Sequence, residues 1–190
     1  MFDAIFKVVI FGDAGCGKTT LTQRFLTTKF IPNTYKTIGV DFDATSLSID
    51  GFNVKLMIWD FGGEKSFRFL FPQYVLGAMG GVMMYDITNQ SSLYHLSDWL
   101  SIISESKQIF PIILVGGKTD LENQRKVSFE KGENSAKLMG LDDFIECSSK
   151  TGVNIEKVFN TLTRLMLKNI NLEEIPNSLP IPNKSKFFLR

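Results

Sequence analysis

Short continuous apolar runs, separated by stretches of helical character, constrain the fold of this chain more than any other feature. The clearest runs lie within residues 6–11, where the run follows Lys7, and at residues 81–85 and 111–115; a shorter candidate covers residues 142–146. A run without polar alternation is typical of a strand buried on both faces of a parallel sheet. Strands that alternate with helices form β-α-β units, so the sequence predicts an α/β fold with a mainly parallel sheet.

One segment departs from this pattern. Two β-rich runs within residues 40–60 flank Asp50 and Gly51, a pair that readily takes the positive φ angles of a two-residue hairpin turn. One antiparallel strand is therefore expected. Helical periodicity, which marks core-facing helices, predicts helices at residues 18–27, 91–106, 128–139 and 153–168.

Length and charge limit the number of domains and the kinds of partner. The chain has 190 residues, 44% of them hydrophobic, which suits one compact domain and is too little for two ordinary ones. We expect this domain at residues 1–170 and a flexible, proline-containing tail at residues 171–190. Since 21 Lys and Arg nearly balance 20 Asp and Glu, no overall field attracts nucleic acid.

Cysteine usage and the N-terminus indicate the compartment. Cys16 and Cys147 form neither a disulfide framework nor a CxxC pair for zinc, which indicates a reducing environment. The first residues lack the pattern of a signal peptide, so none is expected, and no apolar run approaches the roughly 18 residues that span a bilayer. We expect a cytoplasmic monomer, with no nucleophilic role for Cys16 and with His95 as a solvated surface residue on its helix.

The strongest motif is GDAGCGKT at residues 12–19, which satisfies G-x-x-x-x-G-K-S/T between a buried strand and a helix. Its glycines let successive N–H groups point at phosphate oxygens, and the helix N-terminus adds a partial positive charge. Lys18 would reach the β- and γ-phosphates, and Thr19 would bind Mg²⁺. Nucleotide contacts are expected from Asp13, Ala14, Gly15, Cys16, Gly17, Lys18, Thr19 and Thr20.

The segment GGKTD at residues 116–120 indicates which base is bound. It follows another apolar run, and its carboxylate at Asp120 can accept both N–H groups on the Watson–Crick edge of guanine, a pair that adenine lacks. Lys118 would lay its aliphatic stem along the base. Asp120 therefore favours GTP and GDP over ATP. The triplet Lys-x-Asp also occurs in surface turns, and its position two strands after the phosphate loop strengthens the prediction.

Residues 4–170 resemble Rab-type small GTPases of the Ras superfamily, because five motifs occur in that family's order. They are the phosphate loop, YKTIGVDF at 35–42, WDFGGE at 59–64, GKTD at 117–120 and ECSSKTG at 146–152. The sequence IGVDF at 38–42 and Phe67-Arg68 favour the Rab branch over Ras, Rho and Arf. The resemblance implies the three-layer P-loop NTPase fold, with a six-stranded mostly parallel sheet, one antiparallel strand and five helices.

The resemblance also implies ligand roles. Thr37 and Asp60 would join Thr19 as Mg²⁺ ligands, and Thr37 would sense the γ-phosphate from switch I (residues 30–40). Gly63 would offer its backbone N–H to the same phosphate from switch II (residues 61–73). The guanine pocket would be completed by Phe30, Ser148, Ser149 and Lys150.

Effector proteins, an exchange factor and a GTPase-activating protein are the partners that the resemblance implies. Effectors would bind the switches and an aromatic triad made of Phe42, Trp59 and Tyr74. Exposed aromatic clusters are good anchors for a partner. Ordinary packing of the three rings is the alternative.

Departures from the family pattern limit what is inherited. Gly117 stands where the family has an asparagine that braces the phosphate loop and touches the purine, so weaker nucleotide binding is expected. Glu64 replaces the glutamine that orients the attacking water, and Ala14 replaces a glycine or serine beside the γ-phosphate. With Lys18, Gly63 and Glu64 as the catalytic candidates, we predict slow hydrolysis; the alternative is that the Glu64 carboxylate acts as a base.

Lipid anchoring is not expected, since no cysteine follows Cys147 and residue 2 is phenylalanine. Basic and aromatic residues of the tail suggest at most a weak membrane-surface contact: Lys184, Lys186, Phe187, Phe188 and Arg190. The sequence thus favours a GTPase switch. A non-hydrolysing GTP/GDP-binding scaffold is the alternative, and a metabolic kinase is disfavoured by the guanine-reading Asp120 and by the lack of a lid or second-substrate domain.

Overall fold

A six-stranded sheet forms the centre of the molecule in the computed structural model, which describes residues 2–32 and 37–170. The strand order is β2-β3-β1-β4-β5-β6; β2 runs antiparallel to β3, and the other neighbours are parallel. The predicted α/β fold with one antiparallel strand is confirmed. The strands are β1 (Ala4–Gly12), β2 (Val40–Ile49), β3 (Phe52–Phe61), β4 (Gly80–Asp86), β5 (Ile112–Gly117) and β6 (Asp143–Glu146).

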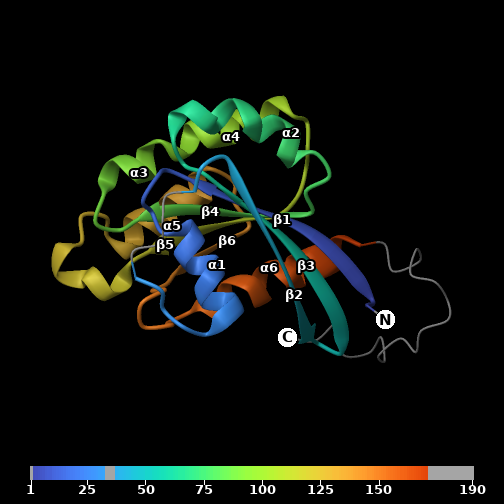
Figure 1. Cartoon of the computed structure of the whole chain (residues 1–190). Helices are drawn as coiled ribbons and strands as arrows, with labels where there is room; N and C mark the ends of the chain where they lie inside the picture. Colours follow the sequence, from blue (N-terminus) through green and yellow to red (C-terminus); the bar gives the residue numbers. More distant parts are fainter. Residues whose placement is uncertain (1, 33–36, 171–190) are drawn as a thin grey trace.

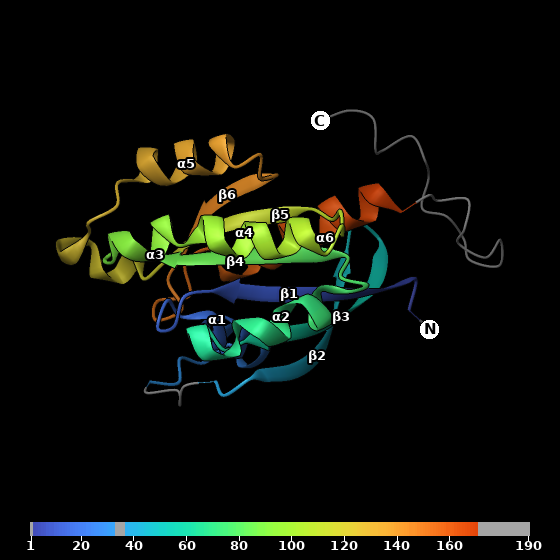
Figure 2. The same cartoon turned by 90° about the horizontal axis from the view of Figure 1, so that it is seen from above.

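Helices cover both faces of the sheet and give three layers (Figures 1 and 2). One core, between the sheet and α1 and α6, holds Leu21 and Phe159; the other, on the opposite face, holds Phe71, Trp99 and Ala136 of α2, α4 and α5. The helices are α1 (Lys18–Thr27), α2 (Phe71–Val75), α3 (Gln90–Tyr94), α4 (Leu96–Glu105), α5 (Phe129–Leu138) and α6 (Ile155–Asn169), with short 3₁₀ helices η1 (Lys65–Leu70) and η2 (Thr119–Gln124).

The helix count differs from the prediction. The family resemblance implies five helices, whereas the described residues form six α-helices. The stretch predicted as one helix at residues 91–106 divides at His95 into α3 and α4. The predicted tail at residues 171–190, with its proposed membrane contact, lies outside the described residues. In the part of the chain that is described, no helix has both the length and the apolar character to cross a membrane.

Burial along the strands follows their place in the sheet. β4 and β5 are buried at every residue, whereas β2, at the edge, is exposed or half-buried at every residue except Ile49. The continuous apolar runs therefore mark strands covered on both faces, as predicted. The hairpin turn between β2 and β3 is also as predicted, with positive φ angles of 49° at Asp50 and 88° at Gly51.

The loops that follow β1, β4, β5 and β6 lie at the same edge of the sheet, because the strands are parallel. The phosphate loop follows β1, and the GKTD segment overlaps the end of β5. Clefts at the carboxyl ends of parallel strands are where α/β proteins bind ligands. The fold thus brings the separate sequence motifs together.

Candidate functional site

Two adjoining cavities lie at this edge, and they share Gly17, Thr20 and Lys118 as lining residues. The first, of about 220 Å³, is also lined by Ala14, Gly15, Lys18, Thr19, Thr37, Phe61, Gly63 and Glu64. The second, of about 210 Å³, is also lined by Cys16, Phe30, Met84, Asp120, Leu121, Ser149 and Lys150. Together they form one elongated site with the predicted phosphate residues at one end and the predicted base residues at the other.

The phosphate loop holds a tight turn around Lys18. Gly12 and Gly17 have φ angles of 137° and 101°, a region that favours glycine. A Cβ atom at Gly12 would overlap the carbonyl oxygen of Met84 in β4. The side chain of Lys18 is 5% exposed, and its Nζ donates to the carbonyl oxygen of Asp13 at 2.9 Å. The loop therefore has the tight turn and the buried lysine that phosphate binding requires.

Three oxygen-bearing side chains converge beside the phosphate loop. The Thr19 Oγ1 and Thr37 Oγ1 atoms are 2.7 Å apart, and the Thr19 hydroxyl also donates to Oδ2 of Asp60. Oδ1 of Asp60 is buried and has no hydrogen-bond partner among the described residues. Burial raises the pKa of the Asp60 carboxyl to about 6, although the hydrogen bond from Thr19 and the Lys18 charge act in the opposite direction. Hard oxygen donors of this kind fit a magnesium ion.

Two glycines place switch II against switch I and against the phosphate loop. The backbone N–H of Gly62 donates to the carbonyl oxygen of Gly39, within switch I, at 2.8 Å. A Cβ atom at Gly63 would overlap the backbone of Asp13 and Ala14. Glu64 follows directly and lines the phosphate cavity together with Ala14. Residues 33–36 of switch I, which include the Tyr35 of the family motif, lie outside the described residues.

At the other end, Asp120 is held by residues that follow β6. The Ser148 hydroxyl donates to Oδ1 of Asp120 at 2.6 Å, and Nζ of Lys150 lies 4.0 Å from Oδ2. Lys118 forms an ion pair with Asp86 at 2.7 Å, which holds its ammonium group while the residue lines both cavities. Phe30, Ser149 and Lys150 therefore line the same cavity as Asp120, as predicted, whereas Ser148 is fully buried behind Asp120 and does not line it.

Comparison with known proteins identifies the family. Residues 7–168 match the Ras family model. The chain is 39% identical over 169 residues to GTP-binding protein ypt2 of Schizosaccharomyces pombe, covering 88% of this chain and 84% of that protein. It is also 39% identical to human Ras-related protein Rab-8B over 172 residues, covering 90% and 82%. Identity to Ras-related protein SEC4 of Saccharomyces cerevisiae is 36% over 175 residues, covering 92% and 80%.

The chain belongs to the Ras family and is a Rab-type small GTPase. GTP binding and a switch function follow from this membership in general terms. Residues of the family's motifs line the two adjoining cavities, and Gly117 is the departure at the base end.

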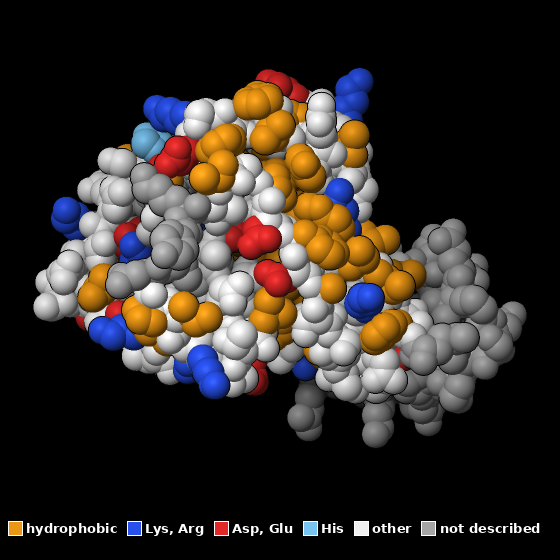
Figure 3. All heavy atoms as spheres, viewed as in Figure 1, with side chains coloured by type: hydrophobic (Ala, Val, Ile, Leu, Met, Phe, Trp, Pro, Cys, Tyr) orange, Lys and Arg blue, Asp and Glu red, His pale blue; other side chains and the backbone are white. Residues whose placement is uncertain are grey.

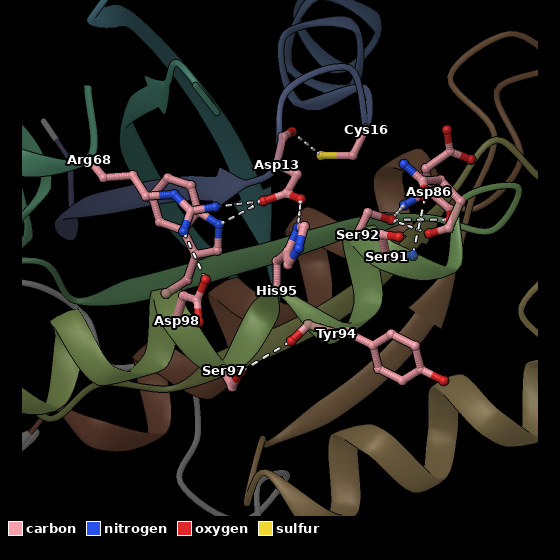
Figure 4. Close-up of polar contacts among 12 residues, drawn as sticks. Asp13, Cys16, Arg68, Asp86, Ser91, Ser92, Tyr94, His95, Ser97 and Asp98 are labelled. Carbon is pink, nitrogen blue, oxygen red and sulfur yellow. Dashed lines mark hydrogen bonds and ion pairs between the residues drawn. The ribbon is translucent and has the colours of Figure 1, made fainter. Parts of the chain in front are cut away.

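In this Rab-type GTPase, Asp13 is not among the lining residues of the phosphate cavity, and its carboxylate points toward Arg68 and His95 (Figure 4). It accepts hydrogen bonds from Nη2 of Arg68 at 2.9 Å and from Nε1 of Trp99 at 3.3 Å, and it pairs with Nδ1 of His95 at 2.5 Å. Arg68 also donates to Asp98 at 3.1 Å and lies over the Trp99 ring at 4.7 Å. Asp13 thus connects the phosphate loop to η1 and to the junction of α3 and α4.

The prediction that His95 is a solvated surface residue is only half right. Its side chain is 40% exposed, but its ring pairs with the Asp13 carboxylate. A signal was present in the sequence, because His95 and Trp99 are four residues apart and share a helix face. The buried Trp99 places that face against the phosphate loop, and only the tertiary arrangement reveals what His95 meets there.

The predicted aromatic triad divides into a surface pair and a packed ring. Phe42 is 49% exposed and meets its cross-strand partner Trp59 edge-on, with ring centroids 4.7 Å apart. Tyr74 packs against Phe61 at 5.4 Å. Hydrophobic side chains gather on this face of the molecule, over β1, β2, β3 and α2 (Figure 3). The exposed large hydrophobic residues in or next to these elements include Ile5, Ile38, Phe42, Phe69, Leu76 and Met79.

Proposed function

We propose that this Rab-type GTPase binds GTP and GDP with Mg²⁺, hydrolyses GTP slowly and recruits effector proteins in its GTP state. The observation that carries the proposal is the pair of joined cavities, with Lys18 and Thr19 at one end and Asp120 at the other. Their arrangement fits the polarity of a nucleotide, which has charged phosphates at one end and a flat, hydrogen-bonding base at the other.

Each end has a distinct chemical task. Lys18 and the backbone N–H groups of the loop would neutralise and orient the phosphates. Thr19, Thr37 and Asp60 would hold Mg²⁺, which neutralises phosphate charge when bound. Asp120, oriented by Ser148, would accept the two guanine N–H groups. The γ-phosphate of GTP would order switch I through Thr37 and switch II through Gly63, and its loss on hydrolysis would release both switches.

Slow hydrolysis follows from two residues that line the phosphate cavity, Glu64 and Ala14. Catalysis of phosphoryl transfer depends on positioning and on stabilising charge that develops on the phosphoryl oxygens. A carboxylate adds negative charge there and cannot donate the hydrogen bond of an amide. The Ala14 methyl group narrows the space for an arginine supplied by a partner. A non-hydrolysing GTP/GDP-binding scaffold is the second candidate, favoured by the same two residues.

A copurification and turnover experiment separates the two candidates. Nucleotide released from the purified protein is identified by chromatography, and preloaded GTP is then followed for hours with Mg²⁺ in a single turnover. Bound guanine nucleotide with slow GDP formation supports the switch. Bound GTP that persists unchanged supports the scaffold, and equal binding of ATP and GTP contradicts guanine recognition.

Effector recruitment has its own test. We expect effectors to contact the surface around Phe42, Trp59 and Tyr74, and to bind better when GTP is loaded. Simultaneous alanine replacement of the three should abolish effector capture and leave nucleotide binding intact. Capture that survives the replacement would show that the rings serve packing alone.

A further inference from the structure

Two residues at the base end of the cavity fit one another closely. Gly117 ends β5, and Met84 lies on the neighbouring strand β4, two residues before Asp86, the cross-strand partner of Gly117. A Cβ atom placed on Gly117 would lie 2.5 Å from Cε of Met84 and 3.0 Å from the carbonyl oxygen of Cys16. The Met84 methyl group therefore fills the space that any side chain at position 117 would need.

Met84 also lines the cavity assigned to the base. It is 1% exposed. Its methyl group lies 3.6 Å from the position of a Cβ atom on Gly17 in the phosphate loop. A thioether is polarizable, packs well against aromatic rings and offers at most a weak hydrogen-bond acceptor. The wall of this cavity beside Gly117 is therefore apolar, while Asp120 supplies a carboxylate to the same cavity.

We propose that Met84 is an affinity-determining residue of the nucleotide site, whose thioether forms the apolar wall against a purine ring in the space left by Gly117. This inference rests on the proposed binding of guanine nucleotides. The effects of substitutions at positions 84 and 117 should therefore depend on each other. A side chain at position 117 would displace the Met84 methyl group, and the open space into which that group can move is the base cavity.

A double-mutant cycle tests the interdependence with N-methylanthraniloyl-GDP as the probe. We expect Gly117→Ala to speed dissociation of the probe about tenfold, because the displaced methyl group occupies base space. Met84→Val should speed dissociation about threefold, through loss of apolar contact. The double variant should dissociate more slowly than Gly117→Ala and close to Met84→Val, because valine removes the methyl group that lies 2.5 Å from the new Cβ atom and leaves only the 3.0 Å approach to the Cys16 carbonyl oxygen. Effects of the two single variants that multiply in the double variant would overturn the proposal.

Met83 provides a matched control, since it is fully buried in β4 and belongs to the core on the opposite face of the sheet. Met83→Val removes the same group, and in the Gly117→Ala background it should not slow dissociation. A comparison of GDP with IDP separates the role of Met84 from that of Asp120. Met84→Val should weaken both nucleotides by the same factor, because the thioether contacts the ring and not the guanine amino group.

Thermal unfolding without nucleotide measures the fit between Met84 and position 117 independently of the probe. Gly117→Ala should lower the midpoint of unfolding by about 3 °C or more in the wild-type background. The same replacement should lower it less in the Met84→Val background, and by the full amount in the Met83→Val background. Failure of the wild type to bind the probe would contradict the proposed function. If Gly117→Ala lowers the unfolding midpoint equally in the wild type, in Met84→Val and in Met83→Val, the proposed fit between Met84 and position 117 is contradicted.

Discussion

The phosphate end and the base end of the cavity are built from different parts of the chain. At the phosphate end, the contacts that fix the shape come largely from backbone: the turn at Gly12 and Gly17, and the approach of Gly63 to the loop. At the base end, the shape is set by side chains, including Asp120, Lys118 and Met84. A cavity wall made of backbone keeps its shape when neighbouring side chains are replaced. A wall made of side chains changes shape with a single replacement, such as the glycine at position 117 in place of the family's asparagine.

The largest effect is expected from removing the charge at the phosphate end. Lys18→Ala should weaken GDP and GTP binding by about 100-fold or more, because a buried charge-assisted contact is lost. Equilibrium titration with fluorescent GDP measures the change. The exposed Lys137, which pairs with Glu133 on α5, is a suitable control. Unchanged affinity in Lys18→Ala would show that this end does not bind phosphate.

The base end should be the next most sensitive. Asp120→Asn should weaken GDP binding by roughly 10- to 100-fold, because an amide cannot accept two hydrogen bonds from the guanine edge. Competition with IDP, which lacks the amino group, gives the sharper measurement. The variant should bind GDP and IDP almost equally. Preserved discrimination between the two would assign base recognition to another residue.

The link between switch II and the phosphate loop should contribute to stability. Arg68→Ala removes a side chain that is 15% exposed and paired with Asp13, so the free energy of unfolding should fall by about 1–3 kcal/mol. Denaturant unfolding measures the loss. Arg164 is the matched control, because its pair with Asp50 is largely exposed and its replacement should cost less than about 1 kcal/mol. Equal losses in both variants would mean that the Asp13 pair is no stronger than a surface pair.

The smallest effect is expected at Glu64. Glu64→Gln should leave the single-turnover rate unchanged or raise it by no more than about tenfold, since an amide removes negative charge beside the γ-phosphate. GTP affinity, measured in parallel, should be preserved. A large loss of rate with preserved affinity would assign a catalytic role to the carboxylate.

Much of the fold could be predicted because the relevant signals are local. The buried runs of β4 and β5, the turn at Asp50 and the start of α1 at Lys18 each depend on a few neighbouring residues. The five motifs likewise predicted which segments gather at the site. The pairing of His95 with Asp13 and the fit of Met84 to Gly117 could not be predicted, because each depends on the register and distance of segments far apart in the sequence.

The contact of Gly62 and Gly63 with their neighbours has a consequence for how the site opens. The chain at these residues passes between switch I and the phosphate loop without any side chain as a spacer. Three loops are therefore stacked with only peptide groups between them, and peptide groups do not compress. If switch I or the phosphate loop moves, the segment at Gly62 and Gly63 must move with it. Otherwise the contacts between the segments break and water enters between them. At position 63, every amino acid other than glycine would wedge the layers apart.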